Sequence, residues 1–248
     1  MPIKYHSEKF DIYNADCFGI LQNMLDNHTV VDAIICDPPY NIDYESWDHS
    51  FDIEKALNIC SKILKPNGNL ILFQGWTNVS NTKQIGDNYF RLKNWIIWDR
   101  IKGRGAKHNL VSTREDILWY CNGDSPTYTK IYSDALKRTG GLGLINGNTT
   151  RALSNVWSDI SPIVPWSNER NGHPTQKPLK LMERCVKLWT NEGDTILDFT
   201  MGSGTTGEAA IRLNRKFIGI ENDDSWYEIA KSRLIQAAEF SRYTKSKL

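Results

Sequence analysis

The chain has 248 residues, of which 40% are hydrophobic and 24% charged, so it can bury a sizeable core within one large domain. Its net charge of +1 neither indicates nor excludes a nucleic-acid partner, because phosphate binding depends on where positive charges cluster. The five cysteines form no C-x-x-C pair, and no apolar stretch has the length of a signal peptide or a membrane helix, so we expect a cytoplasmic protein with reduced thiols and no membrane partner.

Strand-like and helix-like segments alternate along the first half of the chain. In chain order we expect strand 10–16, helix 17–26, strand 31–36, helix 53–64, strand 69–74, a polar helix near 77–88, and strands at about 93–99 and 115–121. The residues KPNG at 65–68 are a strong turn signal between a helix and a strand. This alternation predicts an α/β fold in which helices cover both faces of a sheet.

The second half of the chain begins with an irregular segment. Periodicity fades over 122–172, which is rich in Gly, Asn, Ser and Thr, and an irregular stretch of this length is usually functional or mobile. After it we expect helix 178–190, strand 195–199, helix 205–213, strand 216–220 and a final helix 225–240. The sequence therefore predicts a single domain, 1–248, with an insert at about 122–172.

Positive charge is concentrated in one part of the chain. Between Arg91 and Arg114 there are seven basic residues and one acid, a net charge of +6, which leaves −5 for the remainder. The basic loop at 100–114 lies between two predicted strands. A localised basic surface is therefore expected there.

A glycine-rich turn lies between strand 195–199 and helix 205–213. Residues 198–206 read DFTMGSGTT; the glycines let a ligand approach the backbone, and the helix N-terminus offers free N–H groups. No lysine follows Gly204, so a nucleoside without phosphates fits this turn better than ATP. Glu221 ends the next strand, where a carboxylate can accept hydrogen bonds from a ribose diol. The alternative is a plain strand-to-helix turn beside a solvated carboxylate.

The tetrapeptide Asp37-Pro38-Pro39-Tyr40 follows a buried strand. Its side chains therefore emerge at the carboxyl edge of the sheet, where ligands bind in open α/β folds. The two prolines fix the backbone and remove two N–H donors, which leaves carbonyl acceptors. Together with the Asp37 carboxylate they form an acceptor site for an amine. A loop without function is the alternative reading of this turn.

Three blocks together resemble a known family. The tetrapeptide at 37–40, the segment HPTQKP at 173–178 and the glycine turn at 198–206 occur in the order and spacing of the β-class amino-methyltransferases of DNA. The resemblance spans roughly residues 10–235 and is weakest over 122–170. It implies methyl transfer from S-adenosylmethionine (SAM), with S-adenosylhomocysteine as product, to an exocyclic base amine in double-stranded DNA.

The resemblance also implies a fold and a set of site residues. The fold is a circularly permuted, Rossmann-like SAM-methyltransferase fold with a mixed, mostly parallel seven-stranded sheet and helices on both faces. Asp37, Pro38, Pro39 and Tyr40 are implied as catalytic, with Asp37 and the Pro38 carbonyl on the amine and Tyr40 stacked on the base. The residues implied to surround SAM are Asp16, Cys17, Asp37, His173, Thr175, Lys177, Asp198, Phe199, Thr200, Gly202, Ser203, Gly204, Thr205, Thr206, Glu221 and Asn222.

Within that set, Asp16 is assigned to the adenine amine of SAM, Glu221 to its ribose, and Thr175 and Lys177 to its carboxylate. Thr200 departs from the pattern, because Pro or Cys is expected there. The histidines show no ligand spacing, so no metal site is expected and a positioning role is assigned to His173.

The DNA contacts are expected outside the cofactor pocket. The candidates for phosphate contacts are Lys102, Arg104, Lys107 and Arg114, and the segment 122–172 is the candidate for target recognition. Tyr44 and Trp47 are candidates for stacking on the flipped base or filling its place, with ordinary packing as the alternative. A homodimer and a cognate restriction endonuclease are further partners that the resemblance suggests.

Adenine N6 is the expected target, because this family more often begins the tetrapeptide with Asp for adenine and with Ser for cytosine N4. Cytosine-N4 methylation is the alternative. A DNA-binding protein that keeps an inactive SAM pocket is a second alternative, and methylation of RNA or protein is a third.

Overall fold

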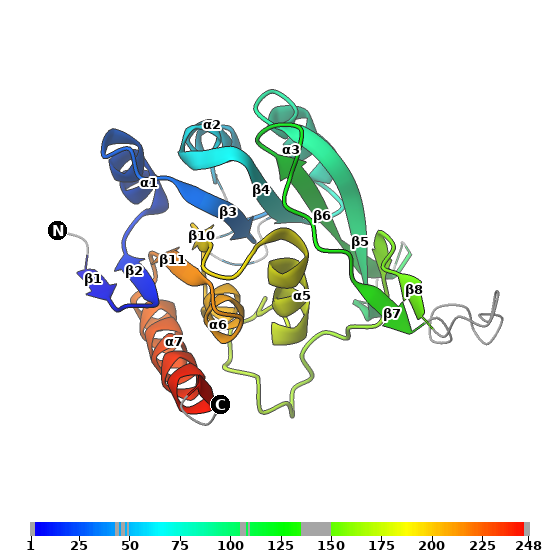
Figure 1. The fold of residues 1–248 in the computed structure, drawn as a ribbon. Coiled ribbons are helices and arrows are strands. Elements are labelled where there is room, and N and C mark those ends of the chain that lie inside the picture. The colour runs from blue at the N-terminus through cyan, green and yellow to red at the C-terminus, as the bar shows by residue number, and fades with distance from the viewer. Residues whose placement is uncertain are drawn as a thin grey trace.

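A computed structural model of the protein describes residues 3–42, 45, 48, 50–104, 108, 110–134 and 150–245, without the side chains of 3, 102–104, 133–134 and 244–245. One sheet of nine strands runs through these residues in the order β1-β2-β11-β10-β3-β4-β6-β5-β9 (Figure 1). In chain order its strands are β1 Ile3–His6, β2 Phe10–Asn14, β3 Val31–Cys36, β4 Leu64–Gln74, β5 Arg91–Arg104, β6 Ser112–Cys121, β9 Val156–Trp157, β10 Thr195–Asp198 and β11 Lys216–Glu221.

The sheet is mixed and mostly parallel, as expected. Strands β2, β11, β10, β3 and β4 pair in parallel, and β6 is antiparallel to both β4 and β5. Strand β1 adds to one edge in antiparallel pairing, and β9 adds to the other in parallel pairing. The C-terminal strands β10 and β11 therefore lie between β2 and β3, which makes the glycine turn after β10 a neighbour of the tetrapeptide after β3.

The expected number of seven strands was wrong by the two edge strands. The seven predicted strands form the continuous middle of the sheet, from β2 to β5. Strand β1 has four residues and β9 only two, too few for an alternating pattern to be visible in the sequence. Edge strands of this length are defined by pairing with a neighbour, not by their own composition.

The expected turn at 65–68 is an irregularity within β4. Val31 pairs with Leu64, but Ala33 pairs with Asn69, so extra residues of β4 are looped out between these two pairs. Asn67 adopts a φ of 64°, a left-handed conformation that asparagine tolerates, and its side chain accepts hydrogen bonds from the backbone of 124–125. The strand therefore continues through the segment where a turn was expected.

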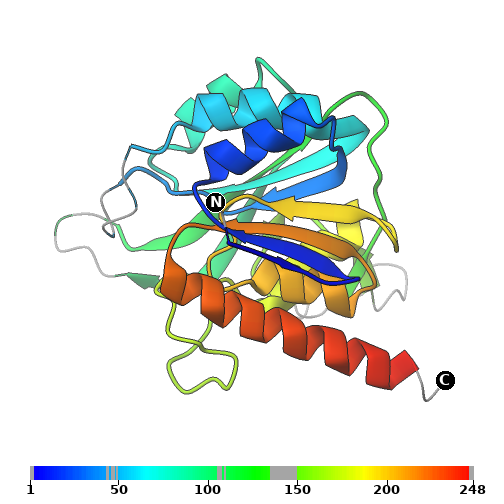
Figure 2. The same ribbon diagram turned by 90° about the vertical axis from the view of Figure 1, so that its left-hand side faces the viewer.

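Among the described residues, helices cover both faces of the sheet (Figure 2). Those on one face are α1 Cys17–Asp26, α2 Ile53–Ile63 and α3 Val79–Gly86. Those on the other face are α5 Leu179–Trp189, α6 Thr205–Arg212 and α7 Asp224–Lys245. Each face has its own apolar core of buried helix and strand residues, which confirms the predicted α/β layers. No helix among the described residues has the length and apolar character needed to cross a membrane.

The segment 122–172 has more structure than its composition indicates. Strands β7 Tyr132–Asp134 and β8 Thr150–Ala152 form an antiparallel pair, and β9 joins the main sheet. Trp157 of β9 is buried and stacks with Trp189 at a centroid distance of 6.0 Å. The description of this segment as irregular is therefore wrong for these strands, whereas residues 135–149 lie outside the described part of the chain.

Candidate active site

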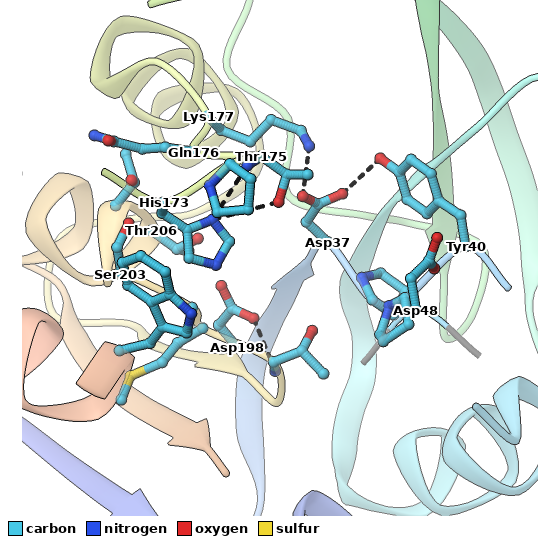
Figure 3. Close-up of a pocket in the computed structure, with 18 of the residues that line it drawn as sticks. Asp37, Tyr40, Asp48, His173, Thr175, Gln176, Lys177, Asp198, Ser203 and Thr206 are labelled. Carbon is cyan, nitrogen blue, oxygen red and sulfur yellow. Dashed lines mark hydrogen bonds and ion pairs between the residues drawn. The ribbon is translucent and has the colours of Figure 1, made fainter. Parts of the chain in front are cut away.

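A cavity of about 880 Å³ opens where the carboxyl ends of the parallel strands meet. Figure 3 shows side chains from the end of β3, from the segment before α5 and from the glycine turn pointing into it. The predicted site residues that line the cavity are Asp16, Cys17, Asp37, Pro38, Pro39, Tyr40, Arg114, His173, Thr175, Lys177, Asp198, Phe199, Thr200, Gly202, Ser203, Thr205, Thr206, Glu221 and Asn222. Gly204, which was also predicted, caps the N-terminus of α6 with a φ of 79° and does not line the cavity.

The Asp37 carboxylate occupies the centre of a polar cluster directly after β3. One oxygen accepts a hydrogen bond from the Tyr40 hydroxyl at 2.6 Å, and the other pairs with the Lys177 ammonium. Burial raises the pKa of Asp37, the Lys177 charge opposes that rise, and Glu115 adds to it. The carboxylate is thus held by two donors, and each of its oxygens has room for one more.

Tyr40 is fixed on the side away from Asp37. Its ring packs against Gly75, where an added Cβ would lie 3.0 Å from the ring, and its carbonyl accepts a hydrogen bond from the Asn78 side chain. These contacts direct the hydroxyl at Asp37. The expected stacking on a base stays a prediction, and the hydrogen bond to Asp37 was not anticipated.

Two charged residues of this cluster were missed by the sequence analysis. Glu115 of β6 lies 3.1 Å from the Lys177 ammonium, and its other oxygen pairs with Arg100 of β5 at 3.0 Å. Both Arg100 and Glu115 line the cavity. The sequence showed only that Glu115 is a charged residue at the start of the strand predicted at 115–121. It did not show the strand order that brings β6 next to β4 and β5, so a place for Glu115 in the cavity could not be predicted.

Glu221 ties the end of β11 to the glycine turn. One carboxylate oxygen accepts a hydrogen bond from the Gly202 N–H at 2.9 Å, and the other accepts from the N–H groups of Asn222 and Asp223, also at 2.9 Å. Gly202 has a φ of 51°, which favours glycine. Burial raises the pKa of Glu221, and the three N–H donors oppose the rise. The carboxylate therefore shapes the turn as well as facing the cavity.

Asp198 and Thr200 form the floor next to β3. The Asp198 side chain is buried and accepts a hydrogen bond from the Thr200 N–H, and burial raises the pKa of Asp198 to about 7. The Thr200 hydroxyl lies 3.0 Å from the Cys36 sulfur. The departure at position 200 thus places a hydroxyl against a buried thiol on the neighbouring strand.

This buried carboxyl predicts a pH dependence of stability. The pKa of Asp198 is higher in the folded protein than in the unfolded chain, so its stabilising contribution is complete below about pH 4 and is lost as the pH rises to about 7. We expect Asp198→Asn to remove this part of the pH dependence, which denaturant unfolding between pH 4 and 8 measures. The exposed variant Asp26→Asn is the control, and an Asp198→Asn protein whose stability changes with pH as the wild type does would contradict the shift.

The opposite wall is built from the start of α1 and a pair of phenyl rings. Asp16 caps α1 by accepting hydrogen bonds from the N–H groups of residues 18 and 19, at 3.0 and 3.3 Å. Burial raises the pKa of the Cys17 thiol to about 12, so it stays protonated. Phe199 stacks with Phe51 at 6.2 Å, and this second ring was not anticipated.

His173 is held as a neutral ring beside the glycine turn. Burial and the Lys177 charge lower the pKa of His173 to about 4, and its Nδ1 accepts a hydrogen bond from the Thr175 N–H at 3.3 Å. The ring meets Trp226 edge-on at 4.5 Å, and a Cβ on Gly202 would lie 3.1 Å from its Nε2. The positioning role assigned to His173 stays a prediction.

The predicted DNA-contact residues are only partly described. Arg114 lines the cavity, is exposed and pairs with the buried Asp116 at 3.2 Å. Lys107, Tyr44 and Trp47 lie outside the described residues. The side chains of Lys102 and Arg104 lie outside them as well.

The chain is similar to known proteins in both sequence and structure. A family model described as DNA methylase matches residues 31–232. The chain is 32% identical to type II methyltransferase M.HpaI of Haemophilus parainfluenzae over 89% of its own length and 72% of that protein. It is 30% identical to DNA adenine methyltransferase YhdJ of Escherichia coli (strain K12), over 97% of this chain and 87% of that one. The crystal structure of the M1.HpyAVI–SAM complex matches with a TM-score of 0.68 and 28% identity, covering 91% of this chain and 99% of that chain.

Proposed function

The chain belongs to the N6_N4 family of DNA methylases, and from this we propose that it transfers the methyl group of SAM to the N6 amine of a flipped adenine in double-stranded DNA. The observation that carries the proposal is that one cavity joins the Asp37 carboxylate to the glycine turn and Glu221. A methyl donor bound at the turn and an amine bound at Asp37 would then share a single chamber. Methyl transfer requires that arrangement.

The residues of the cavity fit SAM as the cofactor. Its adenosine carries no phosphate, and the turn has no lysine after Gly204, while the carboxylates of Asp198 and Glu221 line the cavity. We assign Glu221 to the ribose hydroxyls and Asp16 to the adenine amine, since both carboxylates face the cavity and keep acceptor capacity beyond their backbone bonds. When bound, SAM supplies an electrophilic methyl group on a positively charged sulfur.

The acceptor side is built to activate an aromatic amine. The lone pair of such an amine is delocalised into its ring, which makes it a poor nucleophile. Hydrogen bonds from its two N–H groups to the Asp37 carboxylate and the Pro38 carbonyl would favour a pyramidal nitrogen and free the lone pair for in-line attack. Pro38 and Pro39 hold this geometry because their rings fix the backbone. The catalytic contribution is therefore positioning and electrostatics.

Adenine is favoured over cytosine as the target base. YhdJ, to which the chain is 30% identical, is named a DNA adenine methyltransferase, and the tetrapeptide of this chain begins with Asp, the residue that the family resemblance associates with adenine. Digestion of methylated DNA to nucleosides tests the assignment. We expect N6-methyladenine, whereas N4-methylcytosine alone would overturn the choice of base. DNA binding without any transfer of label from tritiated SAM would instead indicate an inactive binding protein.

The fold relation and the target-recognition segment are part of the same proposal. The place of β10 and β11 between β2 and β3 supports a circular permutation of the SAM-methyltransferase order. We assign 122–172, within the single domain 1–248, to target recognition.

The location and the partners of the protein are also proposed. The five cysteines are all free and buried, which supports a cytoplasmic location. The type II name of M.HpaI supports a cognate restriction endonuclease. A homodimer is the proposed assembly.

The segment 100–114 was expected to be a loop, but its two ends belong to β5 and β6. This basic segment is the proposed phosphate-binding surface, because flipping a base costs a few kcal/mol that contacts elsewhere must offset. We expect the double variant Lys102→Ala/Lys107→Ala to bind DNA more weakly, and to reduce the slope of log K against log salt by about 2. Fluorescence anisotropy at several salt concentrations measures this slope. The exposed pair Lys62→Ala/Lys216→Ala is the matched control. A slope equal to that of the wild type would place the DNA surface elsewhere.

A further inference from the structure

One buried ammonium is shared by two carboxylates at the acceptor end of the cavity. Lys177, from the segment before α5, pairs with Asp37 after β3 and lies 3.1 Å from Glu115 of β6. Figure 3 shows the Lys177 side chain extending to Asp37, on the opposite side from Tyr40. The Lys177 side chain is 8% exposed and that of Glu115 14%, so these charges interact with little screening by water.

Glu115 itself is anchored from the far side. Its Oε1 pairs with Arg100 of β5 at 3.0 Å, and Arg100 also reaches the Ser112 carbonyl. Glu115 Oε2 is buried and makes no regular hydrogen bond, so its contact with Lys177 is an ion pair of loose geometry. The carboxylate therefore sits at a place that the β5–β6 pairing fixes, and it attracts the Lys177 ammonium as a second partner beside Asp37.

This attraction matters for the acceptor capacity of Asp37. An ammonium has three donors, and the carboxylate of Asp37 also accepts from the Tyr40 hydroxyl. If Lys177 had Asp37 as its sole partner, its donors would compete with the substrate N–H for the same oxygens. A second carboxylate draws part of the ammonium away and leaves an acceptor position open.

We propose that Glu115 is a positioning residue for methyl transfer, which acts through Lys177 to hold the Asp37 carboxylate open to an N–H of the substrate amine. The inference rests on the proposed function, because it takes Asp37 as the acceptor of that hydrogen bond. It also gives Lys177 a role on the amine side of the cavity, in addition to the expected contact with the carboxylate of SAM.

A double-variant cycle tests whether Glu115 acts through Lys177. We expect Glu115→Gln to lower the single-turnover rate of methyl transfer about tenfold, with the dissociation constant for SAM within about twofold of wild type. In a Lys177→Met background, Glu115→Gln should change the rate by less than about twofold, because the residue through which it acts is gone. The exposed variant Glu239→Gln is the matched control. Losses that multiply in the double variant would overturn the inference, as would a Glu115→Gln variant with wild-type rate or weakened SAM binding.

The pH profile gives a second readout that does not need the Lys177 variant. The titratable and charged groups that interact with Asp37 are Tyr40, Lys177, Glu115 and Asp198. Arg100 interacts in turn with Tyr40, and His173 with Lys177. The negative charge of Glu115 raises the pKa of Asp37, so its removal in Glu115→Gln should move the acidic limb of the rate to lower pH. Glu115→Asp keeps the charge and should keep the limb at its wild-type position. An acidic limb that does not move in Glu115→Gln would refute the inference, whereas a wild-type protein that methylates no DNA would refute the proposed function first.

Discussion

Replacing Asp37 by alanine is expected to lower the rate of methyl transfer by about 10³-fold or more, while the affinity for SAM stays within about twofold of wild type. We assign the carboxylate to the amine, and its two contacts are with Tyr40 and Lys177, not with the glycine turn. Its loss removes the acceptor that activates the amine and leaves the cofactor side intact. Single-turnover transfer and calorimetric SAM binding measure the two effects separately.

The structure also indicates that this variant can fold. Without Asp37 the buried Lys177 ammonium keeps Glu115 as a partner, so no unpaired charge is left in the cavity wall. The variant Asp26→Ala, at the exposed end of α1, is the control. A folded Asp37→Ala protein that no longer binds SAM would contradict the assignment of Asp37 to the amine.

The parts of the fold predicted well are those whose signal lies within one segment. Helix α1 was placed at 17–26 from its apolar spacing, and β3 at 31–36 from its buried run, and both have those bounds. Strands β1 and β9 were missed because pairing with a neighbour defines them. The same distinction explains β4, which was expected from 69 but begins at Leu64 through a looped-out turn.

The candidate site divides in the same way. Residues at the carboxyl ends of parallel strands were expected to meet, and Asp37, Asp198 and Glu221 do line one cavity. Glu115 and Arg100 come from the antiparallel pair β5 and β6, whose register against the tetrapeptide has no trace in the sequence. The direction of the Lys177 side chain could not be predicted from the sequence either. Its ammonium could extend to either end of the cavity, and only the positions of its two carboxylate partners show which end it reaches.

The second large effect is expected at Glu221. Its two oxygens accept three backbone N–H groups, from Gly202, Asn222 and Asp223, and we assign the ribose diol to the same carboxylate. Glutamine has one acceptor oxygen, so Glu221→Gln turns an NH₂ group toward N–H donors and leaves the turn without its anchor. Hydrogen bonds to a charged group contribute about 1.5–3 kcal/mol, so we expect the affinity for SAM to fall about 100-fold.

The distribution of this loss between binding and turnover is the decisive feature. Glu221 makes its contacts with the glycine turn and none with Asp37, so the transfer rate at saturating SAM should stay within a few-fold of wild type. Isothermal titration with SAM and single-turnover assays over a range of SAM concentrations separate the two quantities. Glu228→Gln, exposed on α7, is the matched control. If Glu221→Gln kept its affinity for SAM but lost transfer at saturation, the carboxylate would act on the amine, and the division of the cavity into a donor end and an acceptor end would be wrong.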